Sequence, residues 1–93
     1  MILREDTSYL GHIVTSCAGR DSKRLFAIVG ADENDGTVYI ADGRLRCVET
    51  PKKKKLKHLK FTGDVSAEVR TLIRSGELTN KRLYSILNGY RQV

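Results

Sequence analysis

Between residues 9 and 61 the chain alternates short apolar, β-branched runs with turn-forming residues, a pattern typical of closely spaced β-strands. The runs predict five strands, over residues 9–17, 25–31, 37–41, 44–48 and 56–61. A loop over 18–24, a hairpin turn over 32–36 and a tight Asp42-Gly43 turn separate the first four, because Gly, Asn and Asp accept the backbone conformations that turns require. About five short strands so close together favour a small β-barrel.

After Gly63 the apolar spacing changes from that of strands to that of helices. Two groups of apolar residues follow helical spacing: Val69, Leu72 and Ile73, and then Leu83, Ile86, Leu87 and Tyr90. The residues placed to cap or end these helices are Ser66, Gly76, Thr79 and Gly89. Isolated helices shorter than about 12–15 residues are marginal in water, so both apolar stripes need a surface to cover. We expect residues 64–93 to form a short helical tail packed on a barrel of residues 1–63; the alternative is a tail that folds only on a partner.

The charge of the chain is concentrated in one short segment. The whole sequence of 93 residues carries a formal net charge of +6, and the length fits a single small domain. Residues 1–50 contain six basic and eight acidic side chains, residues 51–60 contain six and none, and residues 61–93 contain five and three. This distribution is expected of a chain that binds a phosphate backbone with one element.

The sequence shows no targeting or membrane-spanning pattern. Charge appears at Arg4, before any apolar run long enough for a signal peptide, and no stretch approaches the roughly 18 apolar residues of a membrane span. We therefore expect a cytoplasmic protein with no membrane partner. In that reducing compartment Cys17 and Cys47 would remain thiols, and we interpret both as small buried apolar residues.

The segment from Gly11 to Val29, with Ala18-Gly19-Arg20-Asp21 in its loop, resembles a KOW motif. The resemblance narrows to the family of the fourteenth large-subunit ribosomal protein of archaea and eukaryotes and to short bacterial KOW proteins. Three further features carry it: Ala41-Asp42-Gly43, the block Pro51-Lys52-Lys53-Lys54-Lys55-Leu56-Lys57-His58-Leu59, and the helical tail. The family implies an SH3-like barrel of about five strands whose loop touches RNA. One position departs from the motif, since Lys23 stands where a glycine is usual.

Two groups of basic residues are candidates for contact with RNA. The loop candidates are Arg20, Lys23 and Arg24, with Gly11, Gly19 and Asp21 as loop-forming residues. The candidates of the basic segment are Lys52, Lys53, Lys54, Lys55, Lys57 and Lys60. Guanidinium and ammonium groups bind phosphate oxygens, whereas a solvated loop and a solubilising linker are the plainer interpretations. The few aromatic residues form no interleaved set, so we expect readout of shape and phosphate rather than stacking on bases.

Catalytic and metal-binding patterns are missing from the sequence. The two cysteines and His12 and His58 lack the C-x₂-C and H-x₃-H spacings of zinc sites. The acidic turn over 32–35 lacks the alternating ligand positions of a calcium loop. No phosphate-binding glycine loop or nucleophile elbow occurs. We therefore expect a protein that is not an enzyme and needs no cofactor or metal.

The sequence thus predicts a mainly β protein, an SH3-like KOW barrel followed by a two-helix tail, that binds RNA. The resemblance makes ribosomal RNA and the large ribosomal subunit the expected partners. The alternative is a protein-interaction adaptor of the kind that KOW domains provide in transcription elongation. Which RNA is bound, whether the chain is a ribosomal component or a transient factor, and its oligomeric state stay open.

Overall fold

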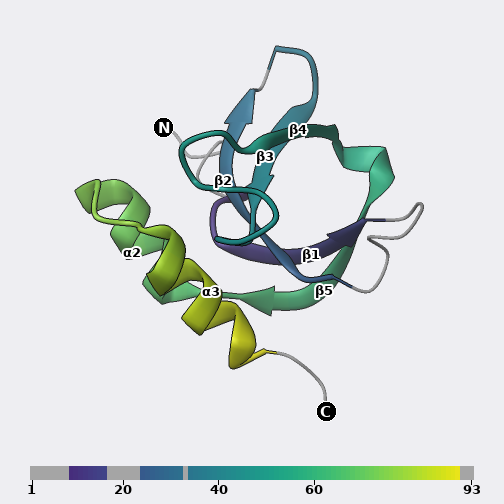
Figure 1. The fold of residues 1–93 in the computed structure, drawn as a ribbon. Helices are drawn as coiled ribbons and strands as arrows, with labels where there is room; N and C mark the ends of the chain where they lie inside the picture. Colours follow the sequence, from purple (N-terminus) through teal and green to yellow (C-terminus); the bar gives the residue numbers. More distant parts are fainter. Residues whose placement is uncertain (1–8, 17–23, 33, 91–93) are drawn as a thin grey trace.

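A computed structural model of the protein describes residues 9–16, 24–32 and 34–90. Its strands are β1 (His12–Ser16), β2 (Phe26–Asp32), β3 (Thr37–Ala41), β4 (Lys52–Lys55) and β5 (Leu59–Val65). They form one sheet in the order β4-β3-β2-β1-β5, with every neighbouring pair antiparallel. A single 3₁₀ turn, η2 (Leu56–His58), joins β4 to β5, and the sheet curls into a small SH3-like barrel (Figure 1). The predicted fold class is confirmed.

The two C-terminal helices begin and end at the residues that the sequence indicates. Helix α2 spans Ala67–Ser75 and helix α3 spans Asn80–Asn88. The hydroxyl of Ser66 accepts a hydrogen bond from the backbone N–H of Val69 at 3.1 Å, and Gly76 ends α2 with a φ of 74°. The hydroxyl of Thr79 accepts from the N–H of Arg82 at 3.2 Å. These contacts satisfy N–H groups that the first turn of a helix leaves open.

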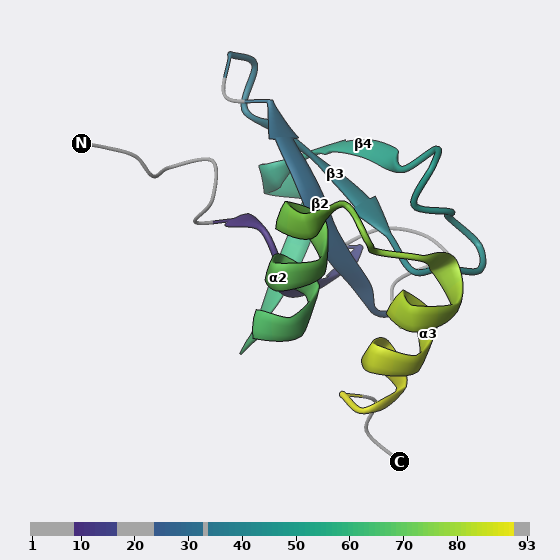
Figure 2. The ribbon, with the colours of Figure 1, turned by 90° about the vertical axis from the view of Figure 1, so that its left-hand side faces the viewer.

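The central strands β1, β2 and β3 are covered on both faces of the sheet. One apolar cluster fills the barrel interior, and its fully packed members are Val14, Phe26, Ile28, Val38, Ile40 and Leu59. A second cluster lies on the outer face, where Ile13, Ala27 and Ala41 of the strands pack against Val69, Leu83 and Leu87 of the helices. Both views place α2 and α3 outside the barrel on the same side (Figures 1 and 2). The helices therefore share a core with the sheet.

The prediction of a strand over residues 44–48 was wrong, because these residues form a loop. One oxygen of the Asp42 carboxylate accepts hydrogen bonds from the N–H groups of Arg44 and Arg46, at 3.0 and 2.8 Å. The N–H of Val48 donates to the side-chain oxygen of Asn80 at 2.7 Å. Side chains thus satisfy the backbone groups that a strand would pair with a neighbour. The fourth strand is instead the lysine run Lys52–Lys55, which pairs with β3 and is not a linker.

The remaining boundaries differ from the predicted ones by a few residues. Residues 56–58 form the 3₁₀ turn, so β5 begins at Leu59 and continues to Val65. The two predicted turns are present: Gly36 and Gly43 have φ values of 67° and 83°, a conformation that glycine adopts without strain. Within residues 9–16, 24–32 and 34–90, no helix is long and apolar enough to cross a membrane.

Candidate nucleic-acid interface

Strand β4 holds four consecutive lysines in an extended backbone, so their side chains alternate between the two sides of the sheet. The register pairs Thr37 with Lys55, Val38 with Lys54, Tyr39 with Lys53 and Ile40 with Lys52. The partners of Lys52 and Lys54 point into the barrel, so these two lysines lie on the inner side of the sheet. Lys53 and Lys55 lie on the outer side.

The two inner lysines border a small cationic hollow. Its lining residues are Ser16, Phe26, Ile40, Arg46, Lys52 and Lys54, and it has a volume of about 80 Å³. Three of these side chains are cations, and no acidic residue is among the described residues that line the hollow. A guanidinium beside two ammonium groups offers several N–H donors to one anion, which suits a phosphate group.

Arg46 is brought to the hollow by a loop that helix α3 holds in place. The side-chain amide of Asn80, at the start of α3, accepts from Val48 and donates to the carboxylate of Glu49 at 2.9 Å. That second bond lowers the pKa of Glu49. The Arg44 guanidinium lies over the Tyr84 ring, 4.6 Å from its centroid. Packing of α3 therefore fixes the loop that carries Arg46.

The charge of Lys53 is matched by two carboxylates of the hairpin between β2 and β3. Its ammonium lies 3.1 Å from the carboxylate of Asp35 and 3.8 Å from that of Asp32. The hydrogen bond to Asp35 raises the pKa of Lys53. The pKa of Asp35 is lowered, first by the hydroxyl of Thr37, which donates to it at 2.6 Å, and then by Lys53. Lys53 thus contacts the hairpin turn between β2 and β3, and it is a weaker candidate for RNA than its neighbours.

The other basic candidates that the structure describes are exposed. Lys55 is exposed on the outer side of β4, and among the described residues it has no carboxylate partner. Lys57 projects from the 3₁₀ turn, and Lys60 stands on β5 opposite Thr15 of β1. Arg24 is exposed just before β2. Lys55, Lys57 and Lys60 follow one another along the segment that leads from β4 into β5, whereas Arg24 lies elsewhere in the chain.

The predicted loop lies mostly outside the described residues. Arg20 and Lys23, and with them Gly19, Asp21 and Cys17, fall in the stretch 17–23 that the structure does not describe. Gly11 precedes β1 with a φ of 83°, and its carbonyl accepts from the N–H of Ser66 at 2.8 Å. A Cβ at Gly11 would lie 2.7 Å from the Ser66 carbonyl oxygen. Gly11 therefore permits the close approach of helix α2 to the start of β1.

An aromatic cluster formed by Tyr9, His12 of β1 and Phe61 of β5 was missed by the sequence reasoning. The Phe61 ring lies 5.4 Å from the His12 ring, edge to face at 75°, and 6.4 Å from the Tyr9 ring. Phe61 is nevertheless 40% exposed. These residues are about 50 positions apart in the chain, and only the pairing of β1 with β5 brings them together. The alternating pattern of a strand does not give that register.

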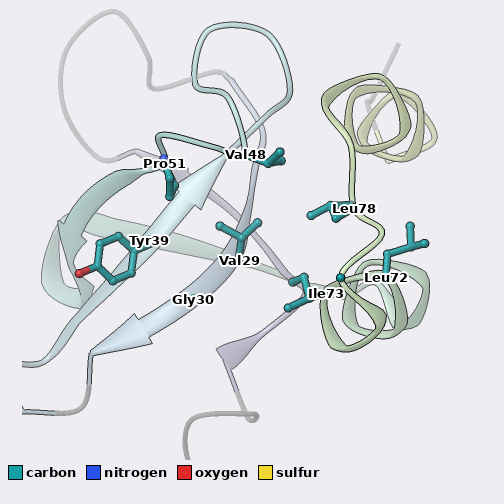
Figure 3. Close-up of a pocket in the computed structure, with 9 residues that line it drawn as sticks. Val29, Gly30, Tyr39, Val48, Pro51, Leu72, Ile73 and Leu78 are labelled. Carbon is teal, nitrogen blue, oxygen red and sulfur yellow. The ribbon is translucent and has the colours of Figure 1, made fainter.

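An apolar groove lies on the outer side of the sheet, away from the cationic hollow. It has a volume of about 450 Å³, and its lining residues are Val29, Gly30, Tyr39, Val48, Pro51, Leu72, Ile73, Gly76 and Leu78. Figure 3 shows Tyr39 and Pro51 on the sheet side, Leu72, Ile73 and Leu78 on the helix side, and Val29 between them. The groove has no cation among its described lining residues, so its chemistry differs from that of the lysine strand.

The described residues do not form a metal site. Across residues 9–16, 24–32 and 34–90, no three His, Cys, Asp or Glu side chains gather closely enough to hold a metal ion. Cys47 lies in the loop before β4 and is half-buried, whereas the sequence analysis predicted a buried side chain. Comparison of the chain with protein-family models and with curated proteins finds no match.

Proposed function

We propose that this chain is a non-enzymatic RNA-binding protein of the cytoplasm, which binds structured RNA through its lysine strand. The ligand is ribosomal RNA, and the protein is a component of the large ribosomal subunit or associates with it. The choice of ribosomal RNA rests on the resemblance of the loop, the basic block and the helical tail to the KOW ribosomal family. The proposal that the protein binds phosphate groups of the RNA rests on the geometry of β4.

The observation that carries the proposal is the arrangement of cations around β4. If the lysine run were a mobile linker, binding to a phosphate backbone would cost much conformational entropy, because each long side chain and its backbone would become ordered. Here the backbone is already fixed by pairing with β3, and Arg46 stands beside Lys52 and Lys54 at one hollow. The exposed Lys55, Lys57 and Lys60 continue the basic surface. The interface is therefore largely pre-formed.

Two single variants of the same strand test this arrangement. Lys55→Gln and Lys53→Gln each remove one positive charge, but of these two lysines only Lys53 is matched by carboxylates among the residues that the structure describes. Each phosphate contact contributes about −0.9 to the slope of log affinity against log salt on a duplex. We expect Lys55→Gln to reduce the slope for an RNA duplex by about one contact, and Lys53→Gln to reduce it much less. Slopes that fall equally in the two variants, or that do not fall at all, would contradict the interface.

The cellular ligand is tested by sedimentation of a native lysate at low and high salt, with RNA crosslinking on the same fractions. Co-migration with large ribosomal subunits that persists in high salt, together with crosslinks to ribosomal RNA, is the expected result. A protein that stays near the top of the gradient without RNA crosslinks would contradict the proposal.

The alternative function, an adaptor that binds another protein, is favoured by the apolar groove between the sheet and the helices. Interface cores are depleted in charge and enriched in aromatic side chains, and Tyr39 on the sheet side of the groove fits that composition. The two functions separate in a pull-down with nuclease treatment. An RNA-binding protein loses its partners when the RNA is digested, whereas an adaptor retains them.

A further inference from the structure

Strand β5 presents an aromatic ring to solvent in the middle of an exposed strand. Of its seven residues only Leu59 is buried, and Phe61 and Val65 are each 40% exposed. A lone exposed apolar residue is ordinary on a protein surface. Phe61 is not alone, because its ring is in contact with the rings of His12 and Tyr9. The group is an aromatic cluster that extends the core out to the surface.

The neighbours of Phe61 hold its ring in place. His12 meets it edge to face at 75°, and Tyr9 packs against the barrel core while its ring is tilted by 47° to Phe61. Contacts of this geometry are favourable between aromatic rings, because the positive edge of one faces the negative face of the other. A ring that is already ordered loses little side-chain entropy when a flat ligand stacks on it.

The shape of β5 disfavours the other common use of an exposed strand, which is to add a strand from another chain. The pairing with β1 shifts register between His12 and Val14, and Gly63 has a φ of 96° there. Bulges of this kind bend a strand and interrupt its row of backbone donors and acceptors. Lys60 and Asp64 add charges to the same edge. These are features by which natural sheets prevent edge pairing.

The charge next to Phe61 is complementary to a nucleic acid. Lys57 and Lys60 precede Phe61 in the chain, and both are exposed. They continue from the lysine strand with no acidic residue between Lys52 and Phe61. A phosphate backbone held along this segment passes beside an ordered aromatic ring. Stacking of bases on aromatic side chains beside a basic track is the general chemistry of single-strand recognition.

We propose that Phe61, braced by His12 and Tyr9, is a stacking platform for an unpaired base of the bound RNA. The inference rests on the proposed function and adds to it the class of RNA element: a single strand, bulge or loop whose base is free to leave its own stack. It replaces the expectation that the protein reads only shape and phosphate. Lys57, in the 3₁₀ turn before β5, holds the backbone on which that base is carried, whereas Lys60 lies on the opposite side of β5 from Phe61.

The test compares two probes, a short oligouridine and a fully paired RNA duplex, against the wild type and three variants. Phe61→Leu removes the aromatic face but keeps an apolar side chain, and Phe61→Tyr keeps the ring. Val65→Ala is the matched control, since Val65 is equally exposed on the same strand. A stacked base is worth about tenfold or more in affinity. We expect Phe61→Leu to weaken oligouridine binding by that factor and to leave the duplex affinity unchanged, while the other two variants bind both probes as the wild type does.

The salt dependence provides a second readout that separates stacking from charge. Stacking releases no counterions, so Phe61→Leu should shift the affinity for oligouridine without changing its slope against salt. An equal urea midpoint for wild type and Phe61→Leu checks that the fold is intact. Unchanged oligouridine binding in Phe61→Leu, with duplex binding by the wild type intact, would overturn the platform alone. A wild type that binds neither probe would overturn the proposed function and the platform with it.

Discussion

Replacement of Gly43 by alanine should destabilise the protein by about 2–5 kcal/mol, more than the same change at Gly36. The φ of Gly43 is 83° and that of Gly36 is 67°, so alanine at either site adopts a left-handed backbone conformation at a cost of about 1–2 kcal/mol. The surroundings differ. A Cβ at Gly36 would meet no atom of the described residues within 4 Å, whereas one at Gly43 would collide with the backbone carbonyl of Asn80 and lie 3.0 Å from the N–H nitrogen of Tyr84.

The additional cost at Gly43 comes from the contacts that hold the loop to helix α3. Relief of the collision must move the loop away from the start of α3, where Asn80 binds the N–H of Val48 at 2.7 Å. Loss of a partly buried hydrogen bond of this kind costs about 1–3 kcal/mol. The two penalties together give about 2–5 kcal/mol for Gly43→Ala, against about 1–2 kcal/mol for Gly36→Ala.

Urea denaturation followed by circular dichroism would measure both variants, and a thermal melt would show the difference. For a domain of this size, 1 kcal/mol corresponds to about 4–8 °C in Tm, so the two melting temperatures should be clearly separated. Equal destabilisation by the two substitutions would refute the reasoning, because it would mean that the loop is not held against α3. Arg46 would then also lack the support that places it at the cationic hollow.

Two further predictions concern the outer core and the ion pair of the hairpin. Leu83→Ala should lower the free energy of unfolding by about 2–5 kcal/mol, because Leu83 is fully buried between α3 and the sheet. Leu45→Ala should change it by no more than about 0.5 kcal/mol, because that side chain is 49% exposed. Equal losses of stability in urea denaturation would contradict the packing of α3. The pKa of Asp35 lies below its ordinary value of 3.8, so the stability that its carboxylate contributes is present above pH 3.8 and is lost as the pH falls through the folded pKa. Thr37→Val should raise the pKa of Asp35 towards 3.8 in an NMR titration, since the Thr37 hydroxyl is the largest cause of the shift. A pKa of 3.8 for Asp35 in the wild type would contradict this account.

The parts of the fold that depend on local chemistry were predicted from the sequence. The helix caps at Ser66 and Thr79 and the stop at Gly76 follow from residues within one turn of each helix end, and the structure has all three. The strands β2 and β3 and the turn between them follow likewise from alternation and turn residues. Propensity and local capping operate over a few residues, so a single sequence contains enough information to place them.

The parts that depend on distant contacts were not predicted. Residues 44–48 have the composition of a strand, but Asn80, 32 positions beyond Val48, takes the N–H that a strand would use. The lysine run has a low intrinsic tendency to form strands, yet it forms β4 because β3 offers it an unpaired edge. For the candidate site, sequence reasoning found the lysines but not Arg46 beside them, nor the contact of Lys53 with Asp35.

The burial of β1, β2 and β3 on both faces of the sheet affects how the chain folds during synthesis. The strands precede the helices, so the barrel wall is made while its outer face, with Ile13, Ala27 and Ala41, still lacks Val69, Leu83 and Leu87 to cover it. Until residues 67–88 have been added, a translating chain carries this uncovered apolar surface. Folding of the barrel is then completed only when α2 and α3 have been added, and barrel and helices should unfold together as one cooperative unit.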